Sequence, residues 1–183
     1  MSTHLLAIGR GMYRLNGLDV GLLILRVVAG LTLSMHGLNK IFGGGKIRGT
    51  TGWFKSMGMR APRFNAWTAA FTEIGSGALM ALGLLNPLAA GGMLAIMVVA
   101  GITAHRKNGF FIFNPGGGYE YVLVLAAIAL CLGATGPGRL SLDKEFGVHL
   151  IGLRWGLPIV AAAGFGGAAL QLLTFWRPRR AQQ

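Results

Sequence analysis

The 183-residue sequence contains a single cysteine, Cys131, and only five acidic residues. One cysteine can form neither an intramolecular disulfide nor a Cys-x-x-Cys pair, which excludes a self-contained thiol–disulfide enzyme that uses a vicinal cysteine pair. Charged residues of both signs make up 12% of the chain, about half of the roughly 25% that is usual in soluble domains. The long uncharged stretches that remain are typical of a membrane protein.

Hydrophobic residues, 53% of the chain, gather in runs that meet or approach the length of a bilayer core. A transmembrane helix needs about 20 mostly apolar residues. The sequence therefore predicts four spans, at about residues 18–38, 66–85, 88–104 and 119–134. We expect a fifth apolar run, 153–176, to form an additional C-terminal transmembrane helix, although Pro158 and a glycine cluster interrupt it.

The expected fold is all-α: an integral membrane four-helix bundle with a fifth C-terminal transmembrane helix. Residues 1–17 are expected to form an N-terminal tail and residues 18–146 the bundle. Residues 147–183 add the extra apolar helix and a basic tail. Within the connection between the first two spans, residues 51–59 are predicted to form a short helix at the membrane interface.

Basic residues far outnumber acidic ones, with 17 Lys and Arg giving a formal net charge of +12. They lie between the apolar runs, so membrane lipids explain them better than nucleic acid, which we do not expect as a partner. With five spans, one side of the membrane carries eleven basic residues and the other five. The positive-inside rule then predicts a cytoplasmic C-terminus and an external N-terminus. Without the fifth span the two sides carry eight each, so this orientation depends on that helix.

Few ionisable residues occur within or beside the spans, and such residues are costly in lipid and usually face the bundle interior. Because successive spans alternate in direction, four residues from four spans, together with a lysine one turn beyond the first of them, should lie toward the same basic face. They are His36, Glu73, His105, Glu120 and Lys40. Arg26 should lie toward the opposite face, where it would pair with Asp143 or extend to the interface.

Three interpretations of this polar group remain open. In the first, the Glu and His side chains satisfy each other and lock the bundle. In the second, they form a quinone-binding or proton-handling site with Glu73 or His36 as proton carrier. In the third, two His and two Glu bind zinc or iron, ligands that suit both metals, although no Glu-x-x-His spacing supports a metal site.

Several short segments, taken in order, carry a family resemblance. They are LRVVAG at 25–30, HGLNKIF at 36–42, FTEIGSG at 71–77, TAH at 103–105, NGFF at 108–111, YE at 119–120 and GPGRLSLD at 136–143. Their order and spacing resemble the DoxX family of small bacterial membrane proteins over about residues 18–146. The apolar run after residue 150 departs from the family pattern.

The resemblance implies a four-helix bundle in the bacterial plasma membrane, with protein partners in a membrane complex. Related DoxD-type proteins are linked to thiosulfate:quinone oxidoreductase, and DoxX-type proteins to membrane redox complexes with soluble partners. The matched polar residues are Arg26, His36, Lys40, Glu73, His105, Glu120, Arg139 and Asp143.

We therefore expect an accessory or quinone-linked subunit of a membrane redox complex, in which His36, Glu73, His105 and Glu120 carry the chemistry. Lys40 and Arg26 are the candidates for holding the quinone. Whether the chain is itself an enzyme stays open. The alternative is a structural or lipid-binding subunit without catalytic activity, and a transporter ranks third because the helices are few.

Overall fold

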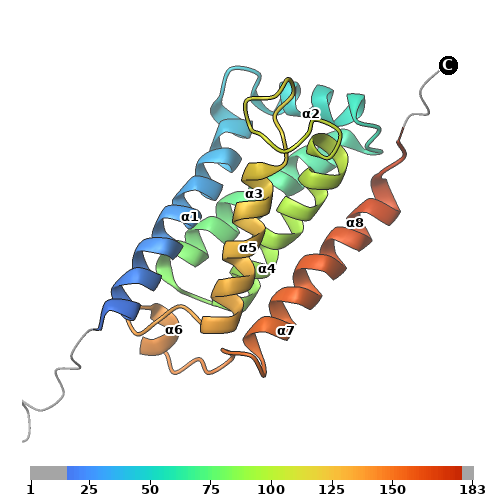
Figure 1. Cartoon of the computed structure of the whole chain (residues 1–183). Coiled ribbons are helices and arrows are strands. Elements are labelled where there is room, and N and C mark those ends of the chain that lie inside the picture. The colour runs from blue at the N-terminus through green and yellow to red at the C-terminus, as the bar shows by residue number, and fades with distance from the viewer. Residues whose placement is uncertain (1–15, 179–183) are drawn as a thin grey trace, which may run out of the picture.

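Long helices run side by side through the computed structural model, which describes residues 16–178 (Figure 1). The elements in chain order are α1 (Gly17–Phe42), α2 (Lys46–Ser56), α3 (Pro62–Leu82), α4 (Asn86–Ala100), the π-helix η1 (Gly101–His105), α5 (Glu120–Thr135), α6 (Leu142–Glu145), α7 (Gly156–Ala161), the π-helix η2 (Ala162–Gly166) and α8 (Gly167–Phe175). The described residues contain no β-strand. Residues 1–15 of the expected N-terminal tail and 179–183 of the basic tail lie outside them.

The all-α membrane fold expected from the sequence is confirmed. Three helical stretches are long and apolar enough to cross a membrane by length and composition: Gly17–Phe42, Asn86–His105 and Gly156–Phe175. The last of these is the expected fifth helix, built from α7, η2 and α8. Helix α5 is apolar but shorter, with 16 residues, and α3 is long enough but carries more polar side chains, among them Asn65 and Glu73.

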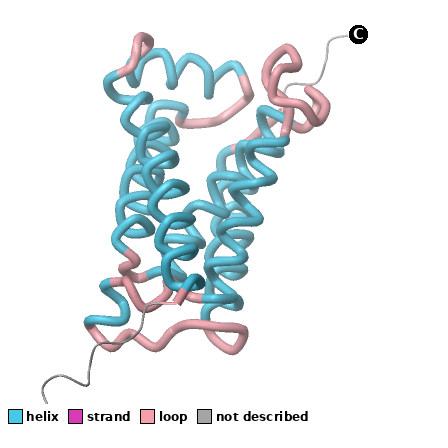
Figure 2. The backbone as a smooth tube through the Cα atoms, turned by 60° about the vertical axis from the view of Figure 1, so that its left-hand side comes forward, coloured by secondary structure: helices cyan, strands magenta, loops and turns pink. Residues whose placement is uncertain are grey.

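Helix α2 lies across one end of the bundle, as Figure 2 shows. It begins earlier than the predicted segment 51–59, at Lys46, and ends at Ser56. One side of this helix is anchored by Phe54, which is buried in a cluster that includes Ala66 and Ala69 of α3. The polar remainder of α2 stays exposed, which suits a helix at the membrane interface.

Helices α1 and α3 approach each other through glycines. A Cβ added at Gly30 would lie 2.5 Å from the carbonyl oxygen of Gly77 and 2.8 Å from the amide nitrogen of Ala81. About two turns further along α1, a Cβ at Gly37 would lie 2.7 Å from the carbonyl oxygen of Ala70. Because these neighbours are backbone atoms, only glycine permits this separation of the two helices.

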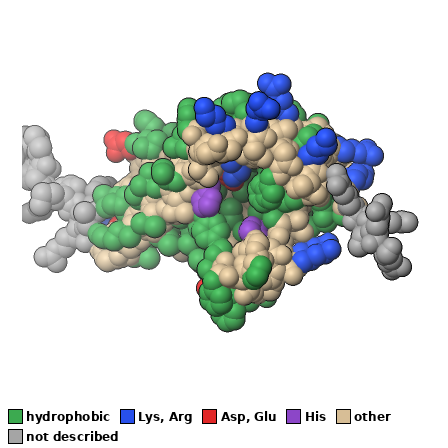
Figure 3. All heavy atoms as spheres, turned by 90° about the horizontal axis from the view of Figure 1, so that it is seen from above, with side chains coloured by type: hydrophobic (Ala, Val, Ile, Leu, Met, Phe, Trp, Pro, Cys, Tyr) green, Lys and Arg blue, Asp and Glu red, His purple; other side chains and the backbone are tan. Residues whose placement is uncertain are grey.

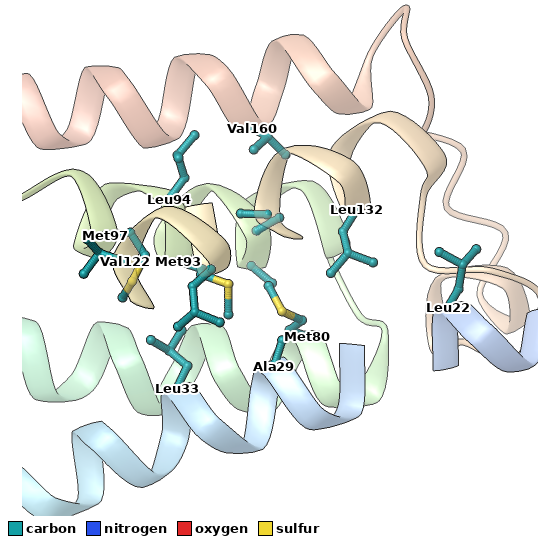
Figure 4. Packing of buried hydrophobic residues seen from close by; sticks show 14 residues of the cluster. Leu22, Ala29, Leu33, Met80, Met93, Leu94, Met97, Val122, Leu132 and Val160 are labelled. Carbon is teal, nitrogen blue, oxygen red and sulfur yellow. The ribbon is translucent and has the colours of Figure 1, made fainter. Parts of the chain in front are cut away.

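The centre of the bundle is filled by aliphatic side chains and methionines from all the long helices. Figure 4 shows them interdigitating between α1, α3, α4, α5 and the C-terminal helix. The fully buried members include Leu33, Met80, Met93, Leu132 and Val160. Flexible methionines suit such irregular gaps between helices.

The C-terminal helix packs back onto the bundle and is fastened at its far end. Helix α7 contacts α4 and α5, and α8 contacts α4. Beyond α8 the backbone pairs with the turn after α2: the N–H of Arg60 donates to the carbonyl of Phe175 at 2.7 Å, and that of Arg177 donates to Gly58 at 2.9 Å. The indole N–H of Trp176 adds a bond to the carbonyl of Met57 at 3.0 Å.

Candidate functional site

The two ends of the bundle differ in charge. One end, termed the basic end, carries α2, the end of η1, the 110–118 loop and the end of α8. Its exposed basic residues are Lys46, Arg48, Lys55, Arg60, Arg63, Arg106, Lys107 and Arg177. The other end, termed the Asp143 end, carries α6 and the turn between α3 and α4. Of the predicted site residues, His36, Lys40, His105 and Glu120 lie at or near the basic end, as expected, and Arg26 lies near the Asp143 end.

A direct ion pair joins α1 to α3 beneath the basic end. The Lys40 ammonium donates to both carboxylate oxygens of Glu73, at 2.8 Å and 2.6 Å. Glu73 is only 4% exposed, and Lys40 is largely buried. The pair is possible because Gly37 lets the helices approach: a Cβ there would lie 3.0 Å from the Cβ of Glu73.

A cavity of about 360 Å³ opens above this pair. His36 and Lys40 of α1 line it together with His105 of η1, which is the convergence expected from the sequence. Asn39, Lys46, Thr50 and Trp53 complete its polar and aromatic wall. Figure 3 looks down on this end, where histidine side chains flank a hollow and basic side chains lie above it and to its right.

A tyrosine that the sequence analysis did not single out belongs to the same region. The ring of Tyr121 lies against that of His36, with the centroids 5.3 Å apart. Its hydroxyl is buried and has no hydrogen-bond partner among the described residues. The sequence feature that could have identified Tyr121 as a site residue is its position directly after Glu120, at the start of an expected span.

His105 and Glu120 also hold the loop that covers this end. The Nδ1 atom of His105 lies 2.9 Å from the carbonyl oxygen of Gly117. The carboxylate of Glu120 accepts the backbone N–H of Ile112 at 3.1 Å. Glu120 therefore shares the end but does not line the cavity. In the part of the chain that the structure describes, no group of three or more His, Cys, Asp and Glu side chains could hold a metal ion.

Arg26 is buried toward the Asp143 end, with 2% of its surface exposed. Its guanidinium donates to the backbone carbonyls of Ala81 and Leu140, the first at the end of α3 and the second just before α6. It therefore links the end of α3 to the segment between α5 and α6, and it lies away from the cavity that His36 and Lys40 line.

Asp143 does not form the direct ion pair with Arg26 that the sequence suggested. Its two carboxylate oxygens accept the backbone N–H groups of Leu85 and Asn86, at 2.7 Å and 2.8 Å. These N–H groups begin α4 and have no partner within the helix. Asp143 thus caps α4 and closes the tight turn between α3 and α4.

Comparison with known proteins identifies a matching family and a similar bacterial protein. The sequence profile of the DoxX family matches residues 21–106. A protein of Bacillus subtilis (strain 168), named putative oxidoreductase CatD, is 33% identical over 125 residues, which is 68% of this chain and 86% of that protein. No solved structure matches the chain.

Proposed function

Because the chain belongs to the DoxX family of membrane proteins, we propose that it is a quinone-linked subunit of a redox complex in the bacterial plasma membrane. The cavity above the Lys40–Glu73 pair carries this proposal. Its volume, about 360 Å³, falls within the roughly 300–1,000 Å³ typical of small-molecule sites. The relative named an oxidoreductase adds the reaction class.

The lining of the cavity suits a quinone headgroup. A quinone has two carbonyl oxygens that accept hydrogen bonds, and His36 and Lys40 supply donors. His105 already donates its Nδ1–H to the Gly117 carbonyl, so its Nε2 is a donor only when the ring is protonated. The indole of Trp53 offers an aromatic face beside them. Hydrogen bonds from charged or imidazole groups would also stabilise the negative charge that develops as the quinone is reduced.

Reduction of a quinone to a quinol takes two electrons and two protons. In this proposal a partner protein supplies the electrons, and histidine, which changes charge near neutral pH, passes protons to the oxygens. Glu73 lies beneath the cavity, where both of its carboxyl oxygens accept hydrogen bonds from Lys40. The exposed cations of the basic end would attract an acidic partner.

Quinone binding should depend on His36 and not on a histidine elsewhere. In detergent, the purified protein should bind a short-chain ubiquinone or menaquinone. His36→Leu should weaken the binding about tenfold, because leucine cannot donate the hydrogen bond that the imidazole gives to a quinone oxygen. His149→Leu is the matched control, since His149 is exposed near the Asp143 end. Equilibrium titration of the quinone against each variant measures the effect.

Two results would contradict the proposal. One is the absence of saturable quinone binding to the wild-type protein. The other is an equal loss of affinity in His36→Leu and His149→Leu, which would indicate non-specific partitioning into the detergent micelle. The structural alternative, in which the Lys40–Glu73 pair only joins α1 to α3, would then account for the polar residues.

We also propose that five helices span the membrane with the basic end in the cytoplasm. In a Cys131→Ser background, Lys144→Cys near the Asp143 end should react with an impermeant maleimide in intact cells in which the reagent can reach the outer face of the plasma membrane. Ser56→Cys, at the end of α2, and Arg177→Cys, just after α8, should react only after the membrane is permeabilised. Labelling of position 56 but not 144 in intact cells would reverse the orientation. Labelling of 177 together with 144 in intact cells would contradict the fifth span.

A further inference from the structure

Two adjoining hollows lie between α4, α5 and the end of α8, and neither is part of the His36 cavity. The first is an apolar groove of about 410 Å³ between α4–η1 and α5. The second is a polar hollow of about 240 Å³ between η1 and Trp176. Both are lined by Ile102 and Arg106, so the groove and the hollow meet at these two side chains.

The groove exists because small residues line it and because no helix among residues 16–178 packs over it. Gly101 and Ala126 face it from η1 and α5. A Cβ at Gly101 would meet only Val122, at 3.7 Å. Helix α7 contacts both α4 and α5, whereas the next helix, α8, contacts α4, and Figure 1 shows α8 leaning away from α5 toward the basic end. Tyr119 and Leu123 on the α5 side are left exposed.

The polar hollow is positively charged. The Arg106 guanidinium lies over the ring of Trp176, 5.6 Å from its centroid, and Lys107 lines the same hollow. Neither cation forms an ion pair with a carboxylate of the described residues. The nearest acidic residue at this end along the chain, Glu120, accepts a backbone N–H from Ile112 instead. Two cations are therefore available to a ligand.

The site also lies at the right depth for a lipid headgroup. The apolar stretch Asn86–His105, which is long enough to cross a membrane, ends one residue before Arg106. The groove extends from Arg106 back along this stretch to Met97, toward the hydrocarbon. Basic pockets between transmembrane helices at such a boundary recognise anionic headgroups.

We propose that this groove and hollow together bind one anionic phospholipid, with an acyl chain in the groove and the phosphate on Arg106 and Lys107. A free phosphate would use the cations but leave the apolar groove open to solvent. A zwitterionic lipid would fill the groove but carry a cationic group into a hollow that already holds two cations. An anionic phospholipid would fill the apolar groove with an acyl chain and pair its phosphate with the two cations of the hollow. This site does not depend on the proposed quinone binding.

Titration of lipids against the purified full-length protein in a mild detergent, read by native mass spectrometry, tests the site. Dioleoyl phosphatidylglycerol should bind about twenty-five-fold more tightly than dioleoyl phosphatidylcholine, because each of the two basic side chains near the headgroup contributes about fivefold. Excess inorganic phosphate should displace neither lipid. Arg106→Gln should lower the affinity for phosphatidylglycerol about fivefold and leave that for phosphatidylcholine unchanged.

Two further variants separate the chain groove from the charge. Gly101→Leu, which places a side chain in the groove, should weaken both lipids alike. Arg154→Gln is the matched control: Arg154 also lies over an indole ring, that of Trp155, at 5.6 Å, but it lines neither hollow. Its lipid affinities should equal those of the wild type.

Three results would overturn the proposal: equal affinity of the wild type for the two lipids, full displacement by inorganic phosphate, or equal losses in Arg106→Gln and Arg154→Gln. Because Arg106 is exposed, its substitution leaves the fold intact and decides the question even if Gly101→Leu fails to assemble.

Discussion

Replacing Glu73 by alanine should lower the free energy of unfolding by about 3–5 kcal/mol, because the Lys40 ammonium would remain in the bundle without its carboxylate. The two groups are 2.6 Å apart at their closest, with 16% and 6% of their side chains exposed. Lys40→Ala should be similarly damaging. The double variant Lys40→Met/Glu73→Leu should recover most of the loss, since an apolar contact replaces the ion pair. Thermal unfolding in detergent measures all three.

The control and the quinone titration make this experiment informative about function. Glu120→Ala removes a carboxylate at the same end that accepts one backbone N–H, and should cost only about 1 kcal/mol. A stable Lys40→Met/Glu73→Leu protein that binds quinone as the wild type does would show that the pair is purely structural. A stable double variant that has lost quinone binding would support the proposed site. Equal destabilisation by Glu73→Ala and Glu120→Ala would contradict the pairing itself.

Arg26→Leu should destabilise the protein by about 2–6 kcal/mol, and the variant should assemble poorly. The carbonyl groups of Ala81 and Leu140, which the guanidinium now satisfies, would each be left unpaired at a cost of about 1–3 kcal/mol. Arg26→Lys should recover only part of the loss, because a single ammonium cannot reproduce the two-pronged guanidinium geometry.

Arg154→Leu provides the comparison for Arg26→Leu, because Arg154 is exposed and its substitution should change the stability by no more than about 1 kcal/mol. Unfolding by denaturant in detergent, with helicity as the signal, measures both variants. If Arg26→Leu were as stable as Arg154→Leu, the interhelical role of Arg26 would be refuted, and a role in binding would have to be considered for it.

The helices and the end at which each polar residue lies could be predicted from the sequence. Run length indicates the spans, and the alternation of their direction puts His36, Lys40 and His105 at one end and Arg26 toward the other. That reasoning predicts the position of a side chain along the bundle axis, but it does not predict which residue that side chain contacts. The partner depends on how each helix is rotated about its axis, which tertiary packing decides.

The Lys40–Glu73 pair illustrates this limit. It requires α1 and α3 to touch along the Gly30 and Gly37 side, where added Cβ atoms would meet backbone atoms of α3. A glycine in a span is compatible with many contacts, so the sequence alone could not select this one. Similarly, the carboxylates of Glu120 and Asp143 bind backbone N–H groups, and such bonds depend on loop and turn geometry rather than on any residue pattern.

The backbone pairing between the turn after α2 and the end of α8 bears on how the chain is made. Trp176 and its acceptor, the carbonyl of Met57, are 119 residues apart. Protein chains are synthesised from the N-terminus onward, so the turn leaves the ribosome long before the strand-like segment that completes it. Until α8 has been inserted, the carbonyl of Gly58 and the N–H of Arg60 have only water or lipid headgroups in place of their partners Arg177 and Phe175. Insertion of the last helix is thus the step that completes the backbone pairing between the turn after α2 and the end of α8. A nascent chain that stops before this step would leave the turn unpaired and accessible to proteases.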